Sequence, residues 1–477
     1  MSLGAYPGSA PRKDEGFLMP SMEPETTAAV AMTNLSAEIQ IAPAVTSFQA
    51  PRPFLSAEKP LHLGLLSVAD QAVASATNFA TGIILARTSS REELGLYMLG
   101  FSVILLAIDL QTNLIATPYM VFSPRLKGHA HALYTGSTLV HQIAFSLLLA
   151  FGLVCGALAS MLGAGPLGLG PVLWALAGVI ALVTLREYAR RLCFARLKLL
   201  TAFLFDSCIA IAQIGGLLLL ARFKLLSASR AYWIIGSACG VALVWWFWRD
   251  RASCRPRMDE SLADLKKNWV FGKWVFASGL VWTLGMNLYP WFLAAFHGTA
   301  ITGVWAACFG VVSVGNPALL GIQNFVGPKI AHEYAAAGPQ ALRSLVLKIT
   351  AGISLPVSFL CLALILWGGR LITLLYGRQY AGNNRVVAVL ALSVLISAPA
   401  FCFSRALYAS ERADLDFLAS LAALFVMITL GLWLVRAFGA MGAAYGLLAG
   451  NFVTSALKAG AYLRIQPHSA VAARDLP

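Results

Sequence analysis

The stretch SVADQAVASATNFATGIILAR, residues 67–87, is long enough to cross a bilayer, yet it carries Asp70, Gln71 and Asn78. A membrane-spanning helix needs about 20 mostly apolar residues. The polar side chains recur every three or four residues, so they form one stripe along a helix. Polar groups at membrane depth usually face a bundle interior or a water-filled cavity. We therefore predict a transmembrane helix with one protein-facing or wet side.

The composition of the whole chain supports a membrane protein. Of its 477 residues, 58% are hydrophobic and only 12% are charged, with a mean hydropathy of +0.73. Soluble proteins have about 25% charged residues. From residue 62 onward the apolar residues form continuous blocks, whereas barrel strands would alternate over about 10 residues. This pattern predicts an all-α integral membrane protein.

Twelve such blocks follow one another along the chain. They are approximately 62–87, 92–118, 132–161, 168–188, 199–220, 230–248, 272–296, 299–326, 343–367, 385–408, 415–436 and 438–463.

The positive charges predict the orientation of these spans. With the N-terminus inside, 26 of the 35 Lys and Arg residues fall on the inner side and 9 on the outer side. This asymmetry is the positive-inside pattern, so both termini are expected in the cytoplasm. The net charge of +14 therefore serves topology, and no nucleic-acid partner is expected. The basic stretches 186–198 and 249–274 are expected to lie against anionic lipids of the inner leaflet.

The two halves of the chain resemble each other. Asn78, Gly95, Phe101 and Pro118 in the first half recur as Asn287, Gly303, Phe309 and Pro328, at an offset of 208 to 210 residues. Because each half has six spans, both enter the membrane in the same direction. This predicts a parallel repeat with a pseudo-twofold axis along the membrane normal and a site between the halves.

The predicted organisation has five parts. They are a disordered cytoplasmic tail at 1–60, a first six-helix lobe at 61–248, a basic cytoplasmic linker at 249–271, a second six-helix lobe at 272–463 and a cytoplasmic tail at 464–477.

Charged side chains inside the spans are the first functional candidates. The acids Asp70, Asp109 and Asp206 lie in the first half and are candidates for coupling to H⁺ or Na⁺, or for pairing with cations. In the second half Arg405, Lys458 and Lys348 lie near the inner face, where they are candidates for binding a phosphate. The structural alternatives are polar contacts between helices for the acids and snorkelling to the interface for the cations.

Several segments resemble the Wzx-type polysaccharide flippases of the MOP exporter superfamily. These are ADQAVASATNFATGIILAR at 69–87, REYARRLCFA at 186–195, FGKWVFAS at 271–278, LLYGRQYAGN at 374–383 and GAMGAAYGLLAGN at 439–451. The resemblance covers about 62–463. It implies two lobes around a central cavity, alternating access, and transfer of a lipid-linked oligosaccharide from the inner to the outer leaflet of the bacterial cytoplasmic membrane.

The resemblance implies that the substrate is a sugar linked to polyprenyl pyrophosphate. Such a molecule needs cations to bind its pyrophosphate head and amides or aromatic rings to bind its hydroxyls. Asn78, Asn287, Tyr289 and Gln323 are the candidates for the hydroxyls. The resemblance also allows partners among other polysaccharide assembly proteins. The sequence shows no catalytic nucleophile, metal cluster or phosphate loop, so we expect a protein that is not an enzyme and has no cofactor.

Three other functions stay open at this point. A cation-coupled antiporter of drugs or metabolites, as in the MATE branch of the superfamily, would share the twelve-span plan. A membrane polysaccharide polymerase or ligase would want a larger external loop than 368–384. A scaffold of an assembly complex would tolerate neutralisation of Arg405 and Lys458.

Overall fold

The computed structural model describes residues 58–250, 258–410 and 412–464. The chain divides into two units, Met1–Pro60 and Leu61–Pro477, and everything below concerns the second. The predicted disordered tail at 1–60 lies outside the described residues except for the first turn of α2, and so does the C-terminal tail from residue 465.

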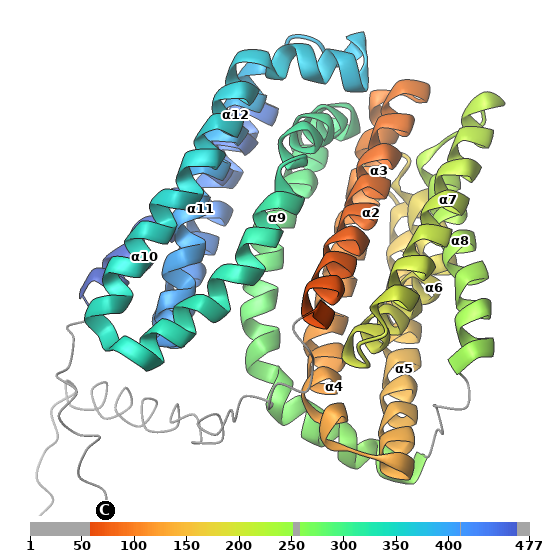
Figure 1. The fold of residues 1–477 in the computed structure, drawn as a ribbon. Helices are drawn as coiled ribbons and strands as arrows, with labels where there is room; N and C mark the ends of the chain where they lie inside the picture. The colour runs from red at the N-terminus through yellow and green to blue at the C-terminus, as the bar shows by residue number, and fades with distance from the viewer. Residues whose placement is uncertain (1–57, 251–257, 411, 465–477) are drawn as a thin grey trace, which may run out of the picture. The chain divides into compact units, whose positions relative to one another are not determined.

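The described residues are helical and contain no strand (Figure 1). Their main helices are α2 (Glu58–Thr88), α3 (Arg91–Gln111), α4 (Thr117–Phe122), α5 (Gly128–Met161), α6 (Leu169–Ala195), α7 (Leu199–Arg222), α8 (Ala228–Asp250), α9 (Met258–Ser313), α10 (Asn316–Tyr376), α11 (Asn384–Ala409) and α12 (Ala413–Arg464).

Two of these helices each contain two membrane crossings. The backbone of α9 kinks at Gly298 (φ 80°), and that of α12 kinks at Gly439 (φ 55°). Both φ values are positive, a conformation that glycine adopts without steric cost. With each arm counted separately, the described residues make about twelve crossings, as the sequence predicts. Nine continuous stretches of them are long and apolar enough to span a membrane, the two-arm helices counting once each.

The helices form two bundles. In the first, α6 lies at the centre and contacts α3, α5, α7 and α8. In the second, α11 packs between α10 and α12, and α12 also contacts α9. Figure 1 shows α9 standing between the two bundles. It is the element through which the second bundle makes its extensive contacts with α3 of the first.

The start of α9 also ties the two bundles together. Residues 258–271, the second part of the predicted linker, are helical and lie against α5. The Tyr134 hydroxyl donates to Asn268 Oδ1 at 2.8 Å, and His141 Nε2 lies 2.8 Å from the Ser261 carbonyl oxygen. The predicted linker at 249–271 is therefore a docked helix from Met258 onward.

Two glycines bring the backbones of α3 and α9 close together. A Cβ added to Gly95 would lie 1.9 Å from the Thr299 carbonyl oxygen, and one added to Gly303 would lie 2.0 Å from the Arg91 carbonyl oxygen. The two contacts are equivalent, because 208 residues separate Gly95 from Gly303 and Arg91 from Thr299. Such reciprocity is the property of a twofold interface, so this crossing lies on the predicted pseudo-twofold axis.

Polar contacts also join the two bundles near this glycine crossing. Arg87 donates from Nε to the Leu375 carbonyl oxygen at 2.7 Å and also to that of Leu374, in the last turn of α10. These carbonyls have no partner within their own helix. Arg91 donates to the Gln379 carbonyl oxygen and lies over the Tyr380 ring. We call this set of contacts the sealed end.

The Tyr380 side chain is neutral at the sealed end. Burial raises the pKa of its hydroxyl to about 12. A neutral ring presents its π-face to the Arg91 guanidinium, which lies 5.9 Å from the ring centroid. The seal between the bundles therefore does not depend on ionisation of this tyrosine near neutral pH.

We expect Gly95→Ala and Gly303→Ala each to destabilise the protein. A methyl group at either position meets backbone of the other bundle, and overpacking of this kind costs about 1–3 kcal/mol. Gly215→Ala in α7 is the control, because its Cβ would meet nothing within 4 Å. Thermal unfolding in detergent measures the difference. If the variants at 95 and 303 unfold at the same temperature as the variant at 215, the glycine crossing is not the tight contact described.

Candidate functional site

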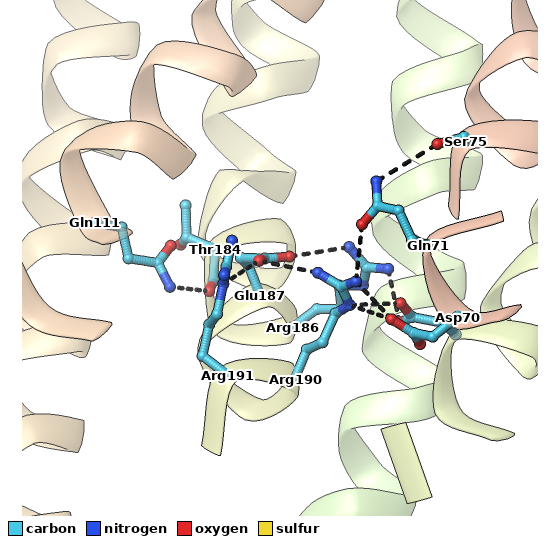
Figure 2. A network of polar contacts seen from close by, with 10 residues as sticks. Asp70, Gln71, Ser75, Gln111, Thr184, Arg186, Glu187, Arg190 and Arg191 are labelled. Carbon is cyan, nitrogen blue, oxygen red and sulfur yellow. Dashed lines mark hydrogen bonds and ion pairs between the residues drawn. The ribbon is translucent and has the colours of Figure 1, made fainter. Parts of the chain in front are cut away.

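A cluster of six charged side chains lies inside the first bundle (Figure 2). We call it the arginine–carboxylate cluster, and it consists of Asp70 from α2, Arg186, Glu187, Arg190 and Arg191 from α6, and Asp206 from α7.

Arg190 is the centre of the cluster. Its Nη2 lies 2.5 Å from Asp70 Oδ2, and its Nε lies 2.8 Å from Asp206 Oδ2. The other oxygen of Asp206 lies 2.7 Å from Arg186 Nη2. Asp70 and Asp206 are almost fully buried, and Arg190 is 9% exposed. One guanidinium therefore bridges two carboxylates that would otherwise face each other inside the bundle.

The spacing of the four residues on α6 explains how they share one face. Residues three and four apart lie next to each other on a helix, so Glu187 reaches both Arg190 and Arg191. The Arg191 Nε–Glu187 Oε1 distance is 2.8 Å and the Arg190 Nη1–Glu187 Oε1 distance is 3.4 Å. The prediction that 186–198 is a loop against the inner leaflet is wrong up to residue 195, because α6 continues to Ala195 and buries Arg190.

The cluster is electrically balanced, with three carboxylates and three guanidinium groups. Burial of charge is tolerated only when each ion has a partner and further hydrogen bonds. Arg191 differs from the other members because its side chain is 32% exposed. Asp70 Oδ1 is a buried oxygen without a hydrogen-bond donor. The cluster therefore has one cation that a ligand can reach and one carboxylate oxygen that can accept a proton or a small cation.

The second bundle contains a smaller buried ion pair. Lys458 Nζ lies 2.8 Å from Asp416 Oδ1, and both side chains are buried. Ser404 and Tyr408 of α11 donate to the same carboxylate at 2.5 and 2.8 Å. Asp416 follows Asp206 by 210 residues, the offset of the internal repeat. Each bundle thus neutralises an equivalent aspartate with a cation of its own.

The predicted ion-coupling residues do not all meet. Asp70 and Asp206 come together around Arg190, a partner that the sequence interpretation missed. Asp109 lies apart from them on α3, where it accepts from Asn113 Nδ2 at 3.2 Å at the start of a π-helical turn. That pair faces Gly279 of α9, so Asp109 lies at the contact between the bundles.

The predicted substrate-binding residues are scattered. Asn78 is exposed on α2, and Lys348 is exposed on α10. Asn287 donates to the Thr283 carbonyl oxygen of its own helix at 2.9 Å. Arg405 is exposed and lies over the rings of Phe401 and Tyr408 at 4.8 and 5.8 Å.

Three further candidates differ from those in position. Tyr289 is 1% exposed and fills the space beside Gly431 and Gly446, so in this conformation it belongs to the packed core. Lys458 is the buried partner of Asp416. The Gln323 side chain lies outside the described residues. Binding roles for all seven residues stay predictions.

A family model described as "Polysaccharide biosynthesis protein" matches residues 127–384, more than half of the chain, from α5 in the first bundle to the start of α11 in the second. The chain belongs to this family. No curated protein matches it.

Solved structures show that this polysaccharide biosynthesis protein shares its fold with MOP-superfamily transporters. It resembles an inward-facing multidrug MATE transporter with a TM-score of 0.68 and 14% identity, over 81% of this chain and 93% of the other. A MOP transporter from Pyrococcus furiosus gives 0.62 and 12%, over 84% and 94%. A mutant MATE transporter from Vibrio cholerae gives 0.59 and 14%, over 85% and 96%. Family, fold and apolar helices together indicate a multi-pass membrane protein of polysaccharide biosynthesis.

We expect Arg190→Gln to destabilise the protein strongly. The substitution leaves Asp70 without its guanidinium partner in a buried site, and an uncompensated buried charge typically costs 3–5 kcal/mol. The double variant Asp70→Asn, Arg190→Gln should recover part of the loss. Arg412→Gln is the control, because Arg412 and Asp414 form an exposed pair, and such pairs contribute about 0–1 kcal/mol. Equal thermal unfolding of Arg190→Gln and Arg412→Gln would contradict the role of Arg190.

Proposed function

We propose that the protein carries a lipid-linked oligosaccharide from the inner to the outer leaflet of the bacterial inner membrane, by alternating access of its two bundles. The family match carries this proposal, because it assigns polysaccharide biosynthesis to a segment that runs from the first bundle into the second. The MOP-type fold supports transport as the means.

The position of the charges supports a substrate that enters from the cytoplasmic leaflet. In the predicted topology the sealed end faces outward and both termini lie in the cytoplasm. Asp70 precedes Arg87 by 17 residues of continuous helix, which is about 25 Å at 1.5 Å per residue. Lys458 follows the kink at Gly439 by 19 residues, about 28 Å. Both buried charge sites therefore lie far from the sealed end, on the predicted cytoplasmic side.

An anionic head group is the ligand that suits these sites. Arginine binds phosphate through two parallel N–H groups, and a ligand can reach Arg191. A pyrophosphate at Arg191 would compete with Glu187 for the guanidinium. Glu187 would still have Arg186 and Arg190, at 3.3 and 3.4 Å. The cluster can therefore turn one arginine towards a substrate while Glu187 keeps two guanidinium partners.

A second function is a MATE-like antiporter of organic cations or metabolites. The observation that favours it is a buried carboxylate oxygen without a donor in the arginine–carboxylate cluster, Asp70 Oδ1. A coupling proton or Na⁺ could bind there. The flippase could use the same oxygen for coupling, so substrate assays must separate the two functions.

Depletion of the protein from its cell provides this separation. We expect lipid-linked oligosaccharide to accumulate on the cytoplasmic side and surface polysaccharide to fall, while efflux of the cation ethidium stays normal. Labelled lipid-linked sugars and a fluorescence efflux assay measure the two activities. Loss of efflux with normal surface polysaccharide would overturn the flippase proposal in favour of the antiporter.

We expect Arg191→Gln to lower flipping about tenfold or more with little loss of stability, since a charged hydrogen bond to phosphate contributes roughly 1.5–3 kcal/mol. Restoration of surface polysaccharide in depleted cells measures the effect. Arg464→Gln is the control, because Arg464 is exposed at the end of α12, outside the cluster. If Arg191→Gln restores polysaccharide as well as Arg464→Gln does, the cluster does not bind the head group.

A further inference from the structure

The start of α9 is a charged helical segment that precedes the apolar part of the same helix. Its charged residues are Asp259, Glu260, Asp264, Lys266, Lys267 and Lys273. Charged residues are unfavourable at the centre of a membrane span, so residues 258–273 are unsuited to the hydrocarbon core. Figure 1 shows the segment beside α5, which it contacts.

One face of the segment is docked on the first bundle by polar and small residues. Ser261 and Asn268 are buried and hydrogen-bonded to α5. A Cβ added to Gly272 would lie 3.0 Å from the Asn113 carbonyl oxygen. Spacings of seven and four residues place 261, 268 and 272 in one row along a helix. This docked row fixes the rotation of the segment about its axis, and therefore fixes which side chains point outward.

Another face of the segment is exposed and apolar. Leu262 is 76% exposed, Trp269 is 50% exposed, and Leu265 between them is also exposed. Spacings of three and four residues place these side chains next to each other on a helix. A helix on the surface of a soluble protein has the reverse arrangement, with its apolar face buried. The three side chains therefore mark a surface that suits an apolar partner.

Two lysines border this apolar surface. Lys266 is exposed and lies one turn from both Leu262 and Trp269. Lys267 is also exposed, and its ammonium group lies 4.4 Å from the centroid of the Phe122 ring. A ring has no net charge, so this cation–π contact leaves the charge of the lysine in place. We call the set the outer face, and it consists of Leu262, Leu265, Lys266, Lys267 and Trp269.

The acids of the segment are separated from these lysines. Asp259 and Glu260 belong to the first turn of α9, where negative charge suits the positive end of the helix dipole. Each lysine follows one of them by seven residues, about 10 Å along the helix, a separation at which salt screens exposed charges. Asp264 is half-buried and precedes Asn268 of the docked row by one turn. The outer face is therefore locally basic.

The contact with α5 places the segment at the level of the inner head groups. α5 ends at Met161, on the outer side in the predicted topology. His141, the partner of Ser261, precedes Met161 by 20 residues, about 30 Å of helix. Tyr134, the partner of Asn268, precedes it by 27 residues, about 40 Å. The hydrocarbon core is about 30 Å thick, so it ends near Ser261, and Asn268 lies among the head groups.

An apolar and basic face at this depth matches anionic phospholipid. Tryptophan is enriched at membrane–water interfaces, where its ring lies at the head-group level. A lysine can lay its carbon chain along an apolar surface and extend its ammonium group to a phosphate. The attraction between anionic lipid and each lysine near the surface corresponds to about a fivefold change in affinity. The outer face offers both kinds of contact side by side.

We propose that the outer face binds anionic phospholipid of the cytoplasmic leaflet. Lys266 and Lys267 contact the head-group phosphates, and Leu262, Leu265 and Trp269 lie among the first carbons of the acyl chains. The inference goes beyond the proposed function, because this lipid belongs to the membrane and is not carried across it. The docked row joins the start of α9 to the first bundle, and the outer face joins it to the leaflet.

Native mass spectrometry of the purified full-length protein tests the proposal. The probes are dioleoyl phosphatidylglycerol and dioleoyl phosphatidylcholine, which differ only in the head group. The wild type should bind phosphatidylglycerol more tightly than phosphatidylcholine. The double variant Lys266→Gln, Lys267→Gln should bind phosphatidylglycerol about tenfold more weakly or less, because it removes two charges near the head groups. The double variant Lys266→Arg, Lys267→Arg should keep the wild-type preference, because the charges remain.

The double variant Arg412→Gln, Arg464→Gln is the matched control. It removes two exposed cations on the predicted cytoplasmic side, outside the outer face. It should keep the preference for phosphatidylglycerol. The glutamine variants of the exposed lysines should unfold at nearly the wild-type temperature, because surface substitutions change stability little. A loss of lipid preference then reports on binding and not on folding.

Hydrogen–deuterium exchange in nanodiscs locates the bound lipid. The amides of residues 261–270 should exchange about twofold more slowly, or slower still, in phosphatidylglycerol than in phosphatidylcholine, because bound lipid holds the helix closed. The variant Lys266→Gln, Lys267→Gln should exchange equally in both. Equal exchange in the wild type would overturn the proposal. So would a preference for phosphatidylglycerol that survives in this variant, or one that the Arg412 and Arg464 control loses to the same extent. The flippase function would stand in each of these cases, since neither measurement involves its substrate.

Discussion

The contact on which the rest of the structure depends is the crossing of α3 and α9 at Gly95 and Gly303. The backbones meet there without intervening side chains. Close approach of this kind is how small residues hold membrane helices together, because lipid offers no hydrophobic drive for helix association. The kink at Gly298 returns the second arm of α9 to α3. The crossing thereby places two equivalent bundles about one axis and fixes which end is sealed.

The buried charges obey a different rule, since each cluster is balanced within its own bundle. The acids of the first bundle pair with arginines of the first bundle, and Lys458 pairs with Asp416 of the second. The contacts at the sealed end instead run from arginines to backbone carbonyls. If the two bundles rocked against each other, the arginines at the sealed end would exchange their backbone carbonyl partners for water. No buried ion pair would have to separate. A buried ion is unfavourable when it is separated from its partner, but here each ion would move with its partner inside one bundle. The structure therefore suits alternating access.

The sequence was sufficient for the architecture and insufficient for the partners. Hydropathy predicts the crossings, and the 208-residue offset predicts the repeat that brings Gly95 to Gly303. The contact between Asp70 and Arg190 joins residues 120 apart on different helices, and no local pattern encodes it. Hydropathy even places Arg190 in a loop, since charges end an apolar block. The spacing of Glu187 from its arginines was the one local signal that the charges are paired inside a helix.

The charges of each bundle limit what that bundle can bind. In the first bundle Arg191 can turn towards an anion, because Glu187 has two other arginine partners. In the second bundle Lys458 pairs with Asp416, and Ser404 and Tyr408 donate to the same carboxylate. A carboxylate without its lysine would instead attract a cation. The Lys458–Asp416 pair therefore keeps the second bundle from acting as a cation site at this position, whereas the first bundle keeps one arginine within reach of a ligand.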